Sequence, residues 1–130
     1  MMEVKIVTPS GLYNTYEVSK IHCTTTLGEC ALLPNHMPLV ASLPISKLVL
    51  TIQGTEHEFA IGGGILHLNQ NKVEILVDSI EGKEEIDIER AKASAERARK
   101  RLDKKDANTS IRRAEVSLQR AMNRIRVKGH

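Results

Sequence analysis

EEIDIERAKASAERARKRL, residues 84–102, contains the change of periodicity that decides the fold of this chain. Asp87 is the expected N-cap of a helix, and Glu89 lies in the first turn, where the helix dipole favours a carboxylate. The apolar residues that follow are spaced alternately three and four apart, at Ile88, Ala91, Ala95, Ala98 and Leu102. The stretch therefore predicts an amphipathic helix with a thin, alanine-rich apolar face and many arginines.

The residues after this helix predict a second one. A polar break, DKKDANTS at 103–110, offers Asp106, Asn108 and Thr109 as caps, and the helical spacing then returns at Ile111, Ala114, Leu118, Ala121 and Ile125. Two helices joined by a short polar connection run antiparallel. Burying an alanine methyl contributes about 0.8 kcal/mol, whereas ordering a residue costs about 1–2 kcal/mol. We therefore expect a detachable hairpin, closed in one state and open or extended in another.

The residues before position 84 alternate with period two. In KLVLTIQGTEHEFAI (47–61) and GILHLNQNKVEILVD (64–78), apolar residues recur at every second position on either side of a turn, near Gly54 and at Asn69–Asn71. Several short strands fall within about 85 residues, with no helical crossover between them. This pattern predicts an antiparallel sandwich or flattened barrel.

Composition and charge separate the same two parts. The chain has 130 residues, 41% of them hydrophobic but only 2% aromatic, so we expect an aliphatic core. No apolar run approaches the ~18 residues of a membrane span, and no secretory signal is visible at the N-terminus. Residues 1–86 hold 5 basic and 10 acidic side chains, whereas residues 87–130 hold 14 basic and 6 acidic ones. This asymmetry suggests different partners for the two parts.

Few residues suggest chemistry of their own. Gly62–Gly64 lacks the Lys-Ser/Thr of a phosphate loop and has strand patterns on both sides, so a bent or bulged strand is the better interpretation. The histidines, Cys23 and Cys30 fit no metal or nucleophile spacing. We expect two free thiols, although one disulfide is compatible with the sequence. Neither a catalytic site nor a bound metal is predicted.

The arginines are more informative. Arg90 and Arg97 are seven residues apart and share one helix face, and Arg120 and Arg124, four apart, share another. If the hairpin closes, Arg90 comes near Arg120 and Arg124, with Asp87 and Glu81 at the same root. Arginines bind phosphates, and carboxylates accept hydrogen bonds from amines or hydroxyls, so the set suits a nucleotide. A solvated charged face is the alternative. Nucleic acid binding is disfavoured, because aromatics for stacking are scarce and the other part is acidic.

An ordered set of segments resembles one known family. These are VTPSG near the start, GECALLPNHMPLVA (28–41), GGILHL (63–68), NKVEILVD (71–78), EIDIERA (85–91) and LQRAMNRIRV (118–127). The chain is similar to the epsilon subunit of bacterial F-type ATP synthase over nearly its whole length. The resemblance implies an α+β fold, with an antiparallel ten-stranded β-sandwich over residues 1–84 and an antiparallel two-helix hairpin over residues 85–130.

The resemblance also implies partners and a role. The sandwich would bind the gamma subunit and rest on the c-subunit ring through a loop that includes Glu29, Pro34, Asn35 and His36. The extended hairpin would inhibit ATP hydrolysis, its basic second helix, with Arg112 and Arg113, meeting acidic residues of the alpha and beta subunits. The chain would be a non-catalytic regulatory subunit, peripheral on the cytoplasmic face of the bacterial plasma membrane, touching the membrane only through the complex. In isolation we expect a monomer.

Some family members bind ATP through a motif of the form Ile/Leu-Asp-x-x-Arg-Ala. The motif is intact here from Ile86 to Ala91, with the matching acidic residue at Glu81. The resemblance thus implies ATP as a regulatory ligand, with no prosthetic group and an open question over Mg²⁺. Its ligands would be Glu81, Ile86, Asp87, Arg90, Ala91, Arg97, Arg120 and Arg124. Two alternatives stay open: the same subunit without ATP sensing, and a nucleic-acid-binding sandwich.

One departure from the family pattern lies next to the predicted contact loop. Cys30 and Ala31 stand where the family usually has a bulkier apolar residue and a glycine. If that glycine has a positive φ, alanine at position 31 would be strained.

Overall fold

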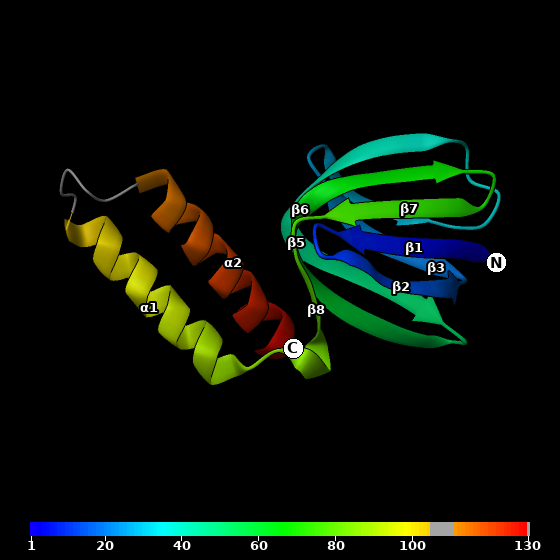
Figure 1. The fold of residues 1–130 in the computed structure, drawn as a ribbon. Helices are drawn as coiled ribbons and strands as arrows, with labels where there is room; N and C mark the ends of the chain where they lie inside the picture. The colour runs from blue at the N-terminus through cyan, green and yellow to red at the C-terminus, as the bar shows by residue number, and fades with distance from the viewer. Residues whose placement is uncertain (105–110, 130) are drawn as a thin grey trace. The chain divides into compact units, whose positions relative to one another are not determined.

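The chain folds into two compact units, Met1–Gly82 and Lys83–His130. A computed structural model, shown in Figure 1, describes residues 1–104 and 111–129. The predicted caps Asp106, Asn108 and Thr109 lie outside the described residues. None of the helices described is both long and apolar enough to cross a membrane.

Over the residues described, the first unit is an eight-stranded sheet. Its strands are β1 (Met2–Thr8), β2 (Gly11–Val18), β3 (Lys20–Thr25), β4 (Gly28–Leu32), β5 (Leu39–Ile52), β6 (Thr55–Asn69), β7 (Lys72–Val77) and β8 (Ile80–Gly82). They lie in the order β2-β1-β7-β6-β5-β3-β4, and β8 pairs with β6. In Figure 1 the strands wrap around a common interior, which gives the unit its layered form.

The expected ten antiparallel strands are wrong in number, and one of the strand pairings described is parallel. The part of the chain that the structure describes has eight strands, and β1 runs parallel to β7, with Glu3 opposite Lys72 and Val7 opposite Leu76. Periodicity of two identifies a strand but carries no information about the direction of a distant partner. β5 and β6 also run unbroken for 14 and 15 residues, so each replaces what could be two shorter strands.

The core of the sandwich is aliphatic, as the composition predicts. The alternate residues of β1 and β7 that point inward are fully or almost fully buried, including Val4, Ile6, Val73 and Ile75. Phe59 adds the one aromatic group among the buried residues described, and the rings of Tyr13 and Tyr16 lie 6.5 Å and 5.9 Å from it, centroid to centroid.

The three consecutive glycines let β6 continue past Pro44 and the end of β7. Gly63 has a φ of 96°, in the left-handed region that favours glycine. A Cβ on Gly64 would collide with the carbonyl oxygen of Leu76. The prediction that a strand passes through these glycines is confirmed, since β6 runs through all three. No bulge is found in this described stretch, because the register with β5 is the same on both sides of Gly63. The predicted strain at position 31 is not found, because Ala31 pairs with His22 in β4 and its φ lies outside the left-handed region.

The second unit contains a short 3-10 turn, η1 (Lys83–Glu85), and the helices α1 (Ile88–Lys104) and α2 (Ile111–Gly129). The two helices pack side by side (Figure 1). Lys128, near the end of α2, donates a hydrogen bond from Nζ to the carbonyl oxygen of Lys83 at 3.0 Å, so the end of α2 lies beside the root of α1. This contact fits the predicted antiparallel hairpin.

Alanines form most of the buried face between the helices. The buried residues of the two helices are Ala91, Ala95, Ala98, Ala114, Ala121, Asn123 and Val127. Ile111 was expected on this face but is 49% exposed at the first residue of α2. The burial of Asn123 and Val127 widens the buried face of α2 beyond the predicted stripe, and it adds one polar side chain.

Candidate functional site: the arginine-bearing hairpin and the exposed loop of the sandwich

The root of α1 is fixed by an aspartate cap. Oδ1 of Asp87 accepts a hydrogen bond from the backbone N–H of Arg90 at 3.1 Å, and the carbonyl oxygen of Asp87 accepts from the N–H of Ala91 at 3.0 Å. Asp87 is exposed, whereas its neighbour Ile86 and Ala91 are buried. The segment from Ile86 to Ala91 is therefore buried at its two apolar ends, and the aspartate between them faces solvent.

The two arginines predicted on α1 lie on the surface. Arg90 and Arg97 are both exposed, and each directly precedes an alanine of the buried face, Ala91 and Ala98. Nη2 of Arg97 donates to Oγ of Ser94 at 3.0 Å, which aligns the guanidinium along the helix. Both side chains thus border the contact with α2, on the same side of α1.

The arginines predicted on α2 are less exposed. Arg120 and Arg124 are half-buried and lie one turn apart. Arg120 also lines an open hollow of about 360 Å³ on α2, together with Arg112, Arg113, Val116 and Ser117. In the sequence-based prediction Arg120 is a nucleotide ligand, whereas Arg112 and Arg113 contact the alpha and beta subunits. The structure brings Arg120 together with Arg112 and Arg113 on one face, a grouping that their spacings of seven and eight residues could have revealed.

The remaining predicted nucleotide ligand belongs to the other unit. Glu81 lies in β8, opposite Ala60 of β6, and is half-buried. Its place in the sandwich is fixed by the β6–β8 pairing, whereas the other seven predicted ligands belong to the helical unit.

The predicted contact loop follows the edge strand β4 and forms a tight turn. Asn35 has a φ of 66°, and the N–H of His36 donates to the carbonyl oxygen of Leu33 at 3.2 Å. Nδ1 of His36 lies 2.8 Å from the carbonyl oxygen of Met37, which accepts a hydrogen bond from the ring N–H. Pro34, Asn35 and His36 are thus brought together, with two apolar side chains at the sides of the turn, Leu33 at 54% and Met37 at 78% exposure.

This loop is tied to the turn between β6 and β7. The N–H of Asn35 donates to Oδ1 of Asn71 at 2.6 Å, and Nδ2 of Asn71 donates to Oδ1 of Asn35 at 3.2 Å. Sequence reasoning missed Asn71 as a partner because the two residues are 36 positions apart. The paired asparagines give the loop a fixed shape, so that its apolar and polar groups are presented together.

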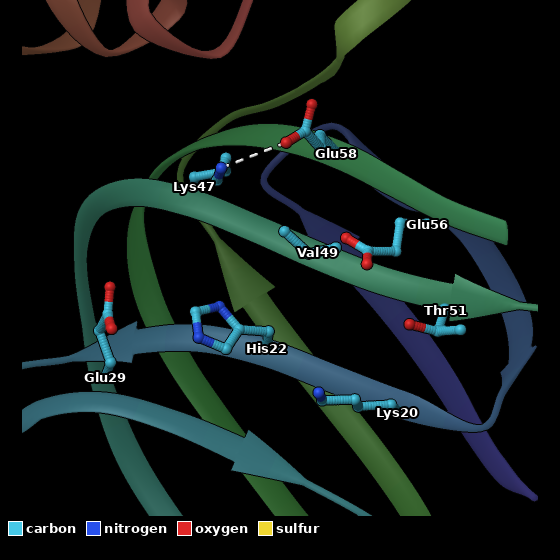
Figure 2. Close-up of a pocket in the computed structure, with 8 residues that line it drawn as sticks. All are labelled: Lys20, His22, Glu29, Lys47, Val49, Thr51, Glu56 and Glu58. Carbon is cyan, nitrogen blue, oxygen red and sulfur yellow. Dashed lines mark hydrogen bonds and ion pairs between the residues drawn. The ribbon is translucent and has the colours of Figure 1, made fainter. Parts of the chain in front are cut away.

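Glu29, predicted with this loop, instead lines a separate cavity. The cavity has a volume of about 330 Å³ on the outer face of β3, β4, β5 and β6 (Figure 2). Its lining residues are Lys20, His22, Glu29, Lys47, Val49, Thr51, Glu56 and Glu58. Nζ of Lys47 and Oε1 of Glu58 form an ion pair at 3.2 Å. The sequence could not reveal this mixed-charge cavity, because its residues come from four strands.

An apolar row crosses another part of the outer face. Leu12, Val7, Leu76 and Ile65 are register neighbours on β2, β1, β7 and β6. Leu12 is 59% exposed, and Leu76 and Ile65 are each 48% exposed. Apolar groups gathered in one exposed row are typical of a surface that another protein covers. By contrast, the described residues contain no cluster of three or more His, Cys, Asp or Glu side chains suited to a metal ion.

Both units match models of one protein family. Residues 1–83 match the model described as ATP synthase, Delta/Epsilon chain, beta-sandwich domain. Residues 84–129 match the model described as ATP synthase, Delta/Epsilon chain, long alpha-helix domain.

Curated relatives agree over the full length. The ATP synthase epsilon chain of Ligilactobacillus salivarius is 37% identical over 134 residues, covering 100% of this chain and 96% of the relative. The ATP synthase epsilon chain of Bacillus velezensis is 40% identical over 129 residues, covering 99% and 98%.

A solved structure supports the fold. A chain of the Euglena gracilis mitochondrial ATP synthase, from a structure of OSCP/F1/c-ring, superposes with a TM-score of 0.83 at 23% identity, covering 99% of this chain and 81% of that one. Two family models that together span residues 1–129, and bacterial relatives matched end to end, identify the chain as a member of the epsilon-chain family of ATP synthase.

Proposed function

We propose that the chain is the non-catalytic regulatory subunit of a bacterial F-type ATP synthase, in which the closed hairpin binds ATP and the opened hairpin inhibits ATP hydrolysis. The observation that carries the proposal is the root of α1, where Asp87 caps the helix and Arg90 and Arg97 border an alanine-lined contact. ATP is then a regulatory ligand and not a substrate, and no prosthetic group is involved.

The thin contact between the helices supports a hairpin that can open. Among the described residues of α1 and α2, five of the seven buried side chains are alanines, and each alanine methyl contributes only about 0.8 kcal/mol on burial. Charge-assisted hydrogen bonds to phosphate contribute about 1.5–3 kcal/mol each. Three or four such bonds can therefore help to decide whether the hairpin stays closed, because they are comparable to the contribution of the five buried alanines.

The charge and exposure of three surfaces support the assignment of a partner to each. We assign the exposed loop with Pro34, Asn35 and His36 to the c-subunit ring, at the cytoplasmic face of the membrane. The apolar row formed by Leu12, Val7, Leu76 and Ile65 suits the gamma subunit, since burial removes these side chains from water. Glu29 would contribute to the contact with the c-subunit ring from the separate cavity on the outer face of β3, β4, β5 and β6. The hollow lined by Arg112, Arg113 and Arg120 suits acidic residues of the alpha and beta subunits.

An ATP titration of the isolated chain tests the nucleotide site. The expected dissociation constant lies between about 1 μM and 1 mM, equivalent to about −8 to −4 kcal/mol. Arg90→Ala is expected to weaken binding at least tenfold in calorimetry and to leave the sandwich folded. Arg99→Ala is the matched control, because Arg99 lies on the opposite side of α1 and pairs with Glu96 at 4.0 Å. Equal affinities for the two variants would remove the site assignment.

The same titration distinguishes the second candidate function, in which the arginines serve only the contact with the alpha and beta subunits. In that case ATP would leave the amide resonances of residues 81–124 unchanged, while Arg112→Ala would still weaken inhibition of the assembled enzyme. Adding Mg²⁺ in a parallel titration shows whether the metal accompanies the nucleotide.

A further inference from the structure

Cys23 and Cys30 lie directly opposite each other on β3 and β4. The neighbouring residues His22 and Glu29 point to the outer face of the sheet (Figure 2). Because successive side chains alternate between the two faces, both cysteines point inward. Both contact the apolar core of the sandwich as free thiols. The two sulfur atoms thus belong to one cross-strand pair that shares one face of the sheet.

The spacing of such a pair suits a disulfide. Directly opposed residues of antiparallel strands have Cα atoms about 4.5–5.5 Å apart, and disulfide-linked residues have Cα atoms about 4.4–6.8 Å apart. The register is fixed by the turn at Thr26–Leu27, where Oγ1 of Thr25 donates to the carbonyl oxygen of Gly28 at 2.9 Å and accepts from the N–H of Leu27 at 3.1 Å. Closure therefore requires side-chain rotation and no change of register.

The two thiols differ in access. Cys23 is 1% exposed and belongs to the core, whereas Cys30 is only partly buried. Cys30 also lies on β4, the last strand in the sheet order, whose outer edge has no neighbouring strand among those described. A small reagent in solution therefore reaches Cys30 first. Burial, and to a lesser extent the nearby Cys30, raises the pKa of the Cys23 thiol to about 11, so Cys23 is protonated at neutral pH and is the second of the two thiols to react.

We propose that Cys23 and Cys30 form a redox-active dithiol, which low-molecular-weight disulfides such as oxidised glutathione convert into a cross-strand disulfide. The thiolate of Cys30 attacks one sulfur of the reagent and releases the first small thiol. The sulfur of Cys23 then attacks the sulfur of Cys30, and its proton passes to the departing small thiolate, which leaves as the second small thiol. Two protein thiols are oxidised, one small disulfide is reduced to two thiols, and the two protons leave with them.

The disulfide would fasten the edge strand that leads into the contact loop. β4 pairs with β3 alone among the described strands and is followed by the turn that begins at Leu33. A covalent link between Cys23 and Cys30 joins this edge to the body of the sheet. Oxidation would thereby limit the opening of β4 without any change at the outer face.

Mass spectrometry of the full chain treated with oxidised glutathione tests the proposal. The wild-type chain is expected to lose two hydrogen atoms and to retain no glutathione, while its thiol titre falls from two to none. Cys23→Ala is expected to keep one glutathione on Cys30, because no second thiol displaces it. Cys30→Ala is expected to stay unmodified over the same period. Dithiothreitol should restore both wild-type thiols.

Three results would overturn the assignment. In the first, the folded wild-type chain keeps both thiols after treatment. In the second, it retains bound glutathione. In the third, it forms a disulfide only with a second copy of itself. A sample unfolded in urea verifies that the reagent is active, and circular dichroism verifies that the treated chain is folded. If Cys23→Ala does not fold, the wild-type mass and thiol titre decide the question together with Cys30→Ala.

Discussion

Asp87 is both a helix cap and a predicted nucleotide ligand, and the two roles can be separated by substitution. Asp87→Ala removes the acceptor of the Arg90 N–H and is expected to destabilise the helical unit by about 1 kcal/mol. Asp87→Asn keeps an acceptor oxygen and should leave the helix content almost unchanged. Thermal unfolding followed by circular dichroism checks both expectations, and an equal loss in the two variants would contradict the cap.

The buried thiol of Cys23 makes the stability of the sandwich depend on alkaline pH. Its pKa is raised to about 11 in the folded chain, mainly by burial, from an ordinary value of 9.0. The protonated thiol therefore contributes stability that is fully present below about pH 9 and is lost as the pH rises through about 11. Urea unfolding of the reduced chain between pH 8 and 11 should show a steeper decline than that of Cys23→Ala. Parallel curves would contradict the raised pKa.

Several residue-level features were predictable because they depend on local chemistry. The cap at Asp87 and the bend at Gly62–Gly64 depend on neighbouring residues, and both are found. The Asn35–Asn71 pair and the cavity around Glu29 depend on residues far apart in the chain. Such contacts follow from the sheet register, which the pattern of alternating residues does not specify.

At the scale of elements, the contact between α1 and α2 depends on small side chains. Ala98→Leu would insert a larger group into a buried site and is expected to destabilise the helical unit by about 1–3 kcal/mol. Ala93→Leu is the matched control, because Ala93 is exposed on the same helix. Amide exchange of residues 88–103 should become faster in the first variant alone. Unchanged exchange would show that the helices do not pack through Ala98.

The elements were predictable in type but not in number. Helical spacing located α1 and α2, the predicted cap at Asp87 located the start of α1, and period-two stretches located β5, β6 and β7. The full lengths of β5 and β6 could not be seen, because Pro44 interrupts the period-two pattern of β5 and the three glycines interrupt that of β6, although a bent strand was predicted at the glycines. In the structure the glycines allow close approach of neighbouring backbone, so the strand continues where the pattern stops.

At the scale of the whole molecule, the chain divides after Gly82 into parts that differ in how they are stabilised. The sandwich has a large aliphatic core, whereas the helical unit buries mostly alanines. A chain ending at Lys83 is expected to keep its sheet. Its free energy of unfolding should differ by no more than about 1 kcal/mol from that of the sandwich in the full chain. Urea unfolding followed by circular dichroism provides the comparison.

The truncated chain also separates the proposed roles. Added to the remaining ATP synthase subunits, it should assemble but should not inhibit ATP hydrolysis, because the arginines of α2 are missing. The full chain carrying Arg99→Ala serves as the control and should inhibit normally. Failure of the truncated chain to assemble would contradict the assignment of docking to the sandwich alone.

The parallel pairing of β1 with β7 has a consequence for synthesis of the chain on the ribosome. β1 lies between β2 and β7, so the strand made first stays without one neighbour until residues 72–77 have emerged. The nascent chain can form local hairpins but cannot close its barrel-like interior before that point. A translational pause before codon 72 would prolong an intermediate whose open β1 edge invites association with another nascent chain.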